Sequence, residues 1–200
     1  MGEQMAGRQS EVNRKTLETD IALKLNIDGA GAAEVHTGVG FLDHMLSSLT
    51  KHAGMDLSLE CTGDLEVDDH HTAEDCAIAL GQAFDKALGD KKGIFRFGHA
   101  YAPLDEALAR VVVDLSGRPY ASVTLGLPDS AIGNMKTENL THVFESFAMS
   151  AKITLHVDVL RGENSHHKAE AAFKALALAL RIAVARRDNS DDVPSTKGVL

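Results

Sequence analysis

Apolar and polar residues alternate along several short stretches of the chain, which is the pattern of half-buried strands. Between Thr19 and Asp28 every second position is apolar, from Ile21 through Ile27. This alternation predicts a strand with one face against a core. Related patterns predict further strands at about 33–37, 57–61, 108–115, 120–127 and 153–159.

Apolar residues spaced three or four apart predict four helices, because this spacing places them on one helical face. The expected helices cover about 41–53, 68–88, 138–151 and 165–186. Gly54 is expected to end the first helix, since glycine readily adopts the left-handed conformation found there. Ser165 is a good N-terminal cap for the last helix.

The predicted elements occur in the same order twice, strand-strand-helix-strand-helix. In each half a single histidine lies on the first helix and an H-H-x-x-E motif begins the second, at 70–74 and 166–170. Repetition of a whole unit indicates an internal duplication. The sequence therefore predicts an α+β fold with two ββαβα halves, at about 8–93 and 94–187, in one catalytic domain spanning 1–200, with a C-terminal tail at 188–200.

The composition excludes several classes of protein. A net charge of -9 leaves no basic surplus for neutralising nucleic-acid phosphates. No apolar run reaches the ~18 residues of a membrane span. The two cysteines, Cys61 and Cys76, form no C-x-x-C motif and are expected to be reduced. We expect a cytoplasmic protein, or a plastid one if a transit peptide has been removed.

The composition is unusual in having ten histidines. Six of them, together with two glutamates of the repeated motifs, are candidate metal ligands. On a helix, residues four apart differ by about 40°, whereas neighbours differ by about 100°. His70 therefore shares a face with Glu74, while His71 points elsewhere and is suited to a second ion. The expected ligands are His44, His70, His71, Glu74, His142, His166, His167 and Glu170, enough for two metal ions.

Imidazole and carboxylate ligands without thiolate suit Mn, Fe, Co, Ni or Zn and disfavour Ca or Mg. Asp68, Asp69 and Asp75 are expected acceptors for the ring N–H groups of these histidines. Arginines, lysines and a hydroxyl in Gly-bearing turns and in the tail could bind a phosphate. The apolar end of the tail, Val199 and Leu200, predicts that the last residues dock. The residues alone thus indicate a dimetal enzyme acting on a small anion.

Six motifs carry a resemblance to a known family over about residues 8–200. They are G-F-L-D-H-M-L (40–46), D-D-H-H-T-A-E-D (68–75), A-P-L-D-E-A-L (102–108), D-L-S-G-R-P-Y (114–120), G-E-N-S-H-H-K-A-E-A-A-F-K (162–174) and P-S-T-K-G-V-L (194–200). Together and in this order they resemble imidazoleglycerol-phosphate dehydratase of histidine biosynthesis, in its monofunctional form. The resemblance implies a hydro-lyase that converts D-erythro-imidazole-glycerol phosphate to imidazole-acetol phosphate and water.

The resemblance also implies a structure and a set of site residues. It implies mixed sheets packed on a four-helix layer, a fold similar to the second domain of a ribosomal protein. It implies a homo-24-mer with two Mn²⁺ ions per active site at subunit interfaces. The implied catalytic residues are Glu18, Glu170 and His71. The implied substrate-binding residues are Glu18, His44, His52, His70, Arg96, Asp105, Arg118, Lys174, Ser195 and Lys197.

The expected chemistry follows from the substrate. The hydrogen that must be lost lies on an unactivated carbon beside the imidazole ring. Metal bound to a ring nitrogen would favour an electron-rich ring able to expel the hydroxyl, while Glu18 moves protons. One departure from the family pattern is Ser47-Ser48, in place of an expected D-Q, which affects a hydrogen bond to substrate and not the reaction.

Two other functions fit the same residues. A dimetal hydrolase of phosphate esters would also need two ions and a phosphate-binding group. A metal-binding or storage oligomer would use the histidines only to bridge subunits. Release of inorganic phosphate would identify the hydrolase, and metal binding without turnover would identify the storage protein.

Overall fold

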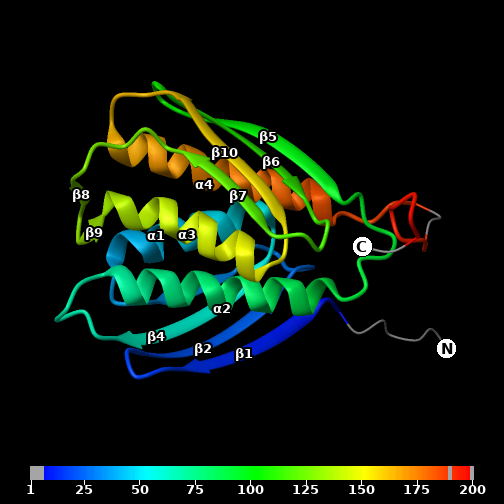
Figure 1. Ribbon diagram of the computed structural model, residues 1–200, viewed down its shortest axis with the longest axis horizontal. Helices are drawn as coiled ribbons and strands as arrows, with labels where there is room; N and C mark the ends of the chain where they lie inside the picture. The colour runs from blue at the N-terminus through cyan, green and yellow to red at the C-terminus, as the bar shows by residue number, and fades with distance from the viewer. Residues whose placement is uncertain (1–6, 189–190, 199–200) are drawn as a thin grey trace.

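The computed structural model describes residues 7–188 and 191–198. Two four-stranded sheets enclose a layer of four helices (Figure 1). The predicted α+β architecture with duplicated halves is confirmed. The first half contains β1 (Gln9–Lys15), β2 (Thr19–Asn26), β3 (Ala33–His36), α1 (Gly40–Ala53), β4 (Asp56–Gly63) and α2 (His70–Leu88).

The second half has the same order with one small insertion. It contains β5 (Phe97–Leu104), β6 (Ala107–Asp114), β7 (Tyr120–Thr124), β8 (Ala131–Ile132), β9 (Met135–Lys136), α3 (Thr137–Ser150), β10 (Thr154–Arg161) and α4 (Ser165–Val184). The sheet orders are β1-β2-β4-β3 and β5-β6-β10-β7. In each sheet only the last pair is parallel, so the halves also match in strand direction.

Each four-stranded sheet has one strand more than the pattern predicts. The additional strands, β1 and β5, form hairpins with β2 and β6. Strand β1 lies at the edge of its sheet, and only Val12 of this strand is buried. Its apolar and polar residues therefore do not alternate clearly enough to predict a strand. The pattern does not predict β5, because its exposed positions include the aromatic residues Phe97 and Tyr101. The short β8–β9 hairpin was also not predicted.

The predicted helix ends are close to those observed. Gly54 follows α1 with φ 72°, as expected for a glycine that ends a helix. The cap of α4 differs from the prediction by one residue. The side chain of Asn164, and not Ser165, accepts a hydrogen bond from the backbone N–H of His167.

Small residues allow the helices and sheets to approach closely. Helix α2 packs beside α3, and α1 packs beside α4. A Cβ atom at Gly81 of α2 would lie 2.7 Å from the carbonyl oxygen of Phe147 in α3. A Cβ atom at Gly98 of β5 would lie 2.0 Å from the carbonyl oxygen of Ala179 in α4. The core between these elements includes the contacting rings of Phe144 and Phe173.

The four helices begin at the same end of the molecule, at the left of Figure 1. Asn134, between β8 and β9, donates a hydrogen bond to the carbonyl of Gly38 just before α1. The backbone N–H of Lys136, just before α3, donates to Asp69 at the start of α2. Within the described ranges, none of the helices has the length and apolar character needed to span a bilayer.

Substituting Gly98 by alanine should destabilise the fold, because β5 must then move away from α4. Overpacking of this kind lowers the free energy of unfolding by about 1–3 kcal/mol. Urea unfolding of Gly98→Ala measures the loss. Gly40→Ala is the control, since the nearest atom to its Cβ lies 4.0 Å away. Equal midpoints for the two variants would contradict the close approach of β5 and α4.

Candidate metal centres and their surroundings

The first cluster joins α1 and α4. His44 lies on α1, and His166 and Glu170 lie one turn apart on α4. Nε2 of His44 is 3.2 Å and Nε2 of His166 is 3.0 Å from Oε2 of Glu170. Each of the three residues offers one ligand atom, and these atoms lie within 4.8 Å of one another. This spacing fits the ligands of a single metal ion.

The second cluster is its counterpart on α2 and α3. Glu74 lies 3.8 Å from Nε2 of His70 and 3.1 Å from Nε2 of His142. The two imidazole rings stack with centroids 4.9 Å apart. Nδ1 of His70 is 2.9 Å from Oδ1 of Asn139. A proton on Nδ1, donated to this oxygen, would leave Nε2 for a metal.

His71 and His167 lie outside both clusters, as the 100° between neighbouring helical residues predicts. Nδ1 of His71 is 3.0 Å from Asp64, and Nδ1 of His167 is 2.7 Å from Glu106. The Nε2 atoms face a second carboxylate, Glu18 at 3.6 Å from His71 and Asp105 at 3.8 Å from His167. Each of these histidines therefore has one nitrogen held by a carboxylate and the other directed away from the three-residue clusters.

The electrostatics favour ionised carboxylates. Burial of Glu170 opposes ionisation, but hydrogen bonds from Lys174, His166 and His44 outweigh it and lower its pKa to about 2. Hydrogen bonding to His167 and to backbone N–H groups lowers the pKa of Glu106 to about 2. The same contact raises the pKa of His167, and the Asp64 contact raises the pKa of His71.

The expected acceptors for the histidine ring N–H groups were wrong. Asp68 accepts from the backbone of His70, and Asp69 accepts from the backbone of Lys136. Asp75 accepts from Arg14 of β1 and Thr19 of β2, and not from a histidine ring. The actual acceptors are Asp64, Glu106 and Asn139, which belong to a loop, a hairpin and a neighbouring helix. None of these three residues belongs to a repeated motif, so the sequence contained no signal for them.

The predicted substrate-binding residues fall into two groups, and His52 lies apart from both. His44, His70, Glu18, Asp105 and Lys174 lie around the clusters and their neighbouring histidines, and Nζ of Lys174 is 2.7 Å from Glu170. His52 is exposed on the last turn of α1, two turns beyond His44. The remaining residues are at the far end of α4.

Arg96 organises this distant group. Its Nε and Nη2 donate to the carboxylate of Asp114 at 2.6 and 3.0 Å, and its Nη1 donates to the carbonyl of Pro194 at 2.8 Å. Arg118 is exposed and also lies 3.7 Å from Asp114. Pro194 immediately precedes Ser195 in the tail, so the tail candidates are near these arginines. The expected docking of Val199 and Leu200 falls outside the described residues.

The two groups lie about 20 Å apart within one chain. The backbone N–H of Arg96 donates to the carbonyl of Ala183, which is thirteen residues beyond Glu170 on α4. At 1.5 Å per residue this separation is about 20 Å. A small substrate could not span it. The arginine group of one chain can therefore meet the histidine clusters only if they come from different chains.

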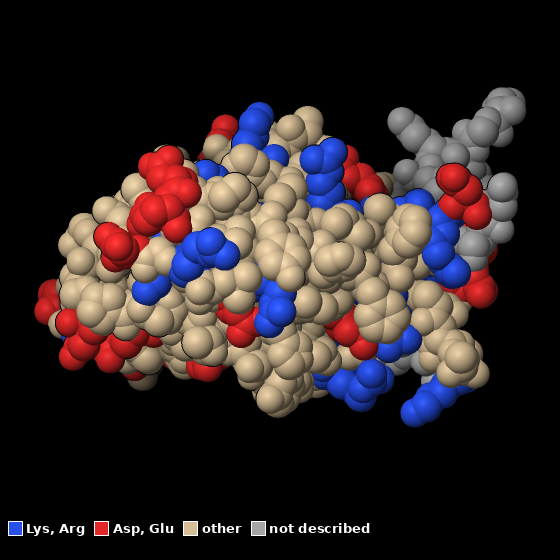
Figure 2. All heavy atoms as spheres, turned by 90° about the horizontal axis from the view of Figure 1, so that it is seen from above, with Lys and Arg blue, Asp and Glu red and all other residues tan. Residues whose placement is uncertain are grey.

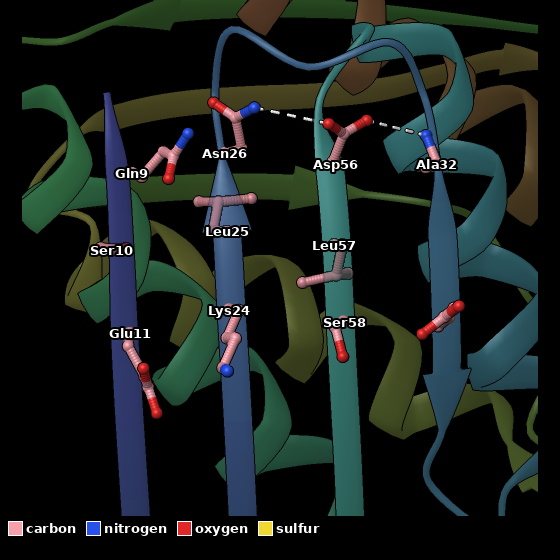
Figure 3. A pocket seen from close by; sticks show the side chains of 11 residues that line it. Gln9, Ser10, Glu11, Lys24, Leu25, Asn26, Ala32, Asp56, Leu57 and Ser58 are labelled. Carbon is pink, nitrogen blue, oxygen red and sulfur yellow. Dashed lines mark hydrogen bonds between the residues drawn. The ribbon is translucent and has the colours of Figure 1, made fainter. Parts of the chain in front are cut away.

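A sizeable cavity lies away from the histidines. It is an open hollow of about 470 Å³ on the outer face of the first sheet. Figure 3 shows Lys24 and Glu11 pointing into it, with Asp56 hydrogen-bonded to Asn26 and the backbone of Ala32. Asp56 thus stabilises the turn between β2 and β3, and no histidine is among the described residues that line the hollow.

Comparisons with known proteins point to one family. A family model described as imidazoleglycerol-phosphate dehydratase matches residues 37–180. The dehydratase of that name from Candida glabrata is 56% identical over 94% of this chain and 98% of its own length. The one from Phytophthora nicotianae is 57% identical over 96% of this chain, which spans only 42% of that relative. The crystal structure of imidazoleglycerol-phosphate dehydratase from Staphylococcus aureus has a TM-score of 0.81 and 40% identity, covering 90% of this chain and 99% of that one.

The Glu106–His167 pair should give the metal-free protein a defined pH dependence. The lowered pKa of Glu106 stabilises the fold above its ordinary value of 4.5, and this stability is lost as pH falls toward 2. The raised pKa of His167 stabilises the fold below 6.5, and this stability is lost as pH rises through the raised value. The pair therefore contributes most between about pH 4.5 and 6.5.

Urea unfolding of the chelated protein and of Glu106→Gln across this range measures the contribution. The unfolding free energy of Glu106→Gln should fall furthest below that of the unsubstituted protein between about pH 4.5 and 6.5. The difference should become smaller at lower and at higher pH. Glu163→Gln, which removes an exposed carboxylate before α4, is the control and should show no such window. A difference that stays constant with pH would refute the assignment.

Proposed function

The chain belongs to the imidazoleglycerol-phosphate dehydratase family, whose members are hydro-lyases of histidine biosynthesis, and from this premise we propose its reaction and its site. The reaction converts D-erythro-imidazole-glycerol phosphate to imidazole-acetol phosphate and water. The pair of matching three-residue clusters, each with a neighbouring oriented histidine, is the observation that carries the proposal. Metal ions could bind the imidazole ring and hydroxyl of this substrate, and the arginines and lysine could bind its phosphate.

The proposed cofactor is Mn²⁺, two ions per active site. Six ligands come from the two clusters, and His71 and His167 supply one each to complete four protein ligands per ion. The donors are imidazole and carboxylate, which suit Mn²⁺, and a six-coordinate ion would keep positions for substrate. When bound, the metal supplies Lewis-acid stabilisation of negative charge on the substrate's imidazole ring.

The protein's own groups supply orientation and proton transfer. Glu18 is the proposed proton carrier, because its carboxylate lies at the tip of the β1–β2 hairpin 3.6 Å from Nε2 of His71. His71 and Glu170 hold the reacting end in place as ligands. Lys174 neutralises Glu170 and adds positive charge beside the cluster. Asp105, at the corresponding hairpin of the second half, is a further polar group for the substrate.

The phosphate is proposed to bind to Arg96, Arg118, Ser195 and Lys197 of a neighbouring chain, since these residues cannot reach the clusters of their own chain. Arg96 is already held rigidly by Asp114, so its guanidinium is positioned before substrate arrives. The hydrogen bond from Arg96 to the carbonyl of Pro194 also holds the C-terminal tail beside this guanidinium. Fixing the phosphate end orients the reactive carbons toward the metals and Glu18.

Self-association into a 24-mer with metal sites at subunit interfaces is the accompanying proposal. The position of His71 and His167 outside both clusters of their own chain supports ligands shared between chains. Figure 2 shows the outer side of the second sheet, where uncharged residues cover most of the middle. Phe97, Tyr101, Val112 and Tyr120 are each more than 40% exposed there. Exposed apolar faces of this kind mark protein interaction sites.

The reaction is tested with imidazole-glycerol phosphate and Mn²⁺. The protein should form the ketone with its phosphate still attached, and Glu18→Gln should lower turnover on the order of 10²-fold or more, because proton transfer is lost. Mass spectrometry of the product and metal analysis of the variant are the measurements. The variant's metal content should equal that of the wild type.

The other outcomes identify the alternatives. Release of inorganic phosphate without ketone would indicate a phosphate-ester hydrolase. Bound metal without any turnover would indicate a metal-storage oligomer. Full activity of Glu18→Gln would refute its role as proton carrier.

Metal should also control assembly. Chelation is expected to lower the particle mass, and added Mn²⁺ should restore it, because bridging ligands lose their partner when the ion is removed. Light scattering after size exclusion measures both. His71→Ala and His167→Ala should behave as if chelated, whereas His36→Ala, an exposed histidine of β3, should not. A large particle that persists without metal would show that assembly is independent of it.

A further inference from the structure

A buried carboxylate lies beneath the turn that carries Glu18. Asp75 of α2 is only 5% exposed and belongs to neither metal cluster. We propose that Asp75 is a positioning residue, which holds the β1–β2 turn so that Glu18 meets the reacting group beside His71. The inference rests on the proposed function of Glu18 and extends it to a residue that does not touch substrate.

In the part of the chain that the structure describes, the side-chain hydrogen bonds of Asp75 all go to this hairpin. The hydroxyl of Thr19 donates to Oδ2 of Asp75 at 2.6 Å, and Thr16 is 3.5 Å from the same oxygen. The guanidinium of Arg14 donates to Oδ1 at 2.6 and 3.2 Å. Three residues around the turn are thus bound to one carboxylate on the helix.

Hydrogen bonds within the turn connect Glu18 to these anchored residues. Oγ1 of Thr16 accepts hydrogen bonds from the backbone N–H groups of Glu18 at 3.1 Å and Thr19 at 2.9 Å. Thr16 and Thr19 therefore connect the backbone of Glu18 to Asp75. On its other side, the carbonyl of Glu18 accepts from the backbone N–H of Asp64, whose carboxylate holds His71. Glu18 and His71 are held in one connected network.

Helical spacing explains why Asp75 is suited to this role. Asp75 is four residues after His71, so both side chains project from the same face of α2, about 40° apart. His71 projects toward the tip of the hairpin and Asp75 projects toward its base. The helix thereby sets the distance between the proton carrier and the histidine beside it.

The second half shows that the fold does not need this carboxylate. The residue four positions after His167 is Ala171, which is fully buried. The corresponding hairpin, with Asp105 and Glu106, is held instead by Glu106, which accepts from the backbone of Glu163 and Asn164. Burying a carboxylate is unfavourable unless it is paired. Its presence in the first half alone indicates a role tied to Glu18.

Asp75→Asn and Thr19→Val test the proposal in the intact Mn²⁺-loaded protein. Asparagine carries no charge and cannot form an ion pair with Arg14. Valine removes the hydroxyl that donates to Asp75. Each variant should lower kcat by about 10- to 100-fold, since small misplacements of a catalytic group have effects of this size. KM should change little, because the groups that bind the phosphate are untouched.

A control variant separates positioning from stability. Ser10 of β1 also connects β1 to α2, by donating to the carbonyl of Ala83 at 2.7 Å, far from Glu18. Ser10→Ala should keep the wild-type kcat even if its melting temperature falls. If kcat falls to the same extent in Ser10→Ala as in Thr19→Val, the effect is one of stability and the proposal is wrong.

A double-mutant cycle with Glu18→Gln completes the test. Asp75→Asn should cause no further loss in that background, because the group it positions is absent. A full additional loss, or a fall in metal content that accounts for the lost activity, would show that Asp75 acts through something else. A wild-type kcat for Asp75→Asn beside an inactive Glu18→Gln would refute the positioning role alone, whereas an active Glu18→Gln would refute the role of Glu18 itself.

Discussion

The close packing of the four helices between two sheets is the constraint on which the rest of the structure depends. Helix α4 contributes a run of alanines that are all fully buried, so it can lie against β5, β6 and α1 at once. Because interiors are packed without voids, small side chains in the layer set how near the helices come. Their first turns therefore meet at one end, and residues as distant in sequence as His44 and Glu170 lie 3.2 Å apart.

Helical periodicity then places the two histidines of each pair in different surroundings. Residues four apart, such as His166 and Glu170, face a partner helix and form a cluster with its histidine. The neighbouring residue of each pair turns toward a hairpin, where a carboxylate holds its Nδ1 atom. Such partners orient the ring and fix which nitrogen is free, as is usual around protein-bound metals. The hairpins missing from the sequence-based prediction turn out to supply Glu18, Asp105 and Glu106.

The two halves share their topology but not their surroundings. Glu170 is paired with Lys174, whereas the position four residues after Glu74 is Ile78. The carboxylate of Asp75 under one hairpin corresponds to Ala171 in the other half. The outer face of the first sheet carries charged residues such as Glu11 and Lys24, and that of the second carries exposed aromatic rings. A duplicated scaffold thus presents one hairpin anchored by a buried carboxylate, one cluster neutralised by a lysine, and one sheet face with exposed aromatic rings.

The sequence by itself determined the α+β class, the duplication, the four helices and the separation of His70 from His71, because these follow from local periodicity. Its motifs also indicated the family that the comparisons support. Only the tertiary structure decided which histidine joins which glutamate, since that depends on how helices from distant parts of the chain pack. It also placed Arg96 about 20 Å from Glu170, by the length of α4. Asp64, Asn139 and Asp75 gained their partners through such contacts, and no pattern along the chain records them.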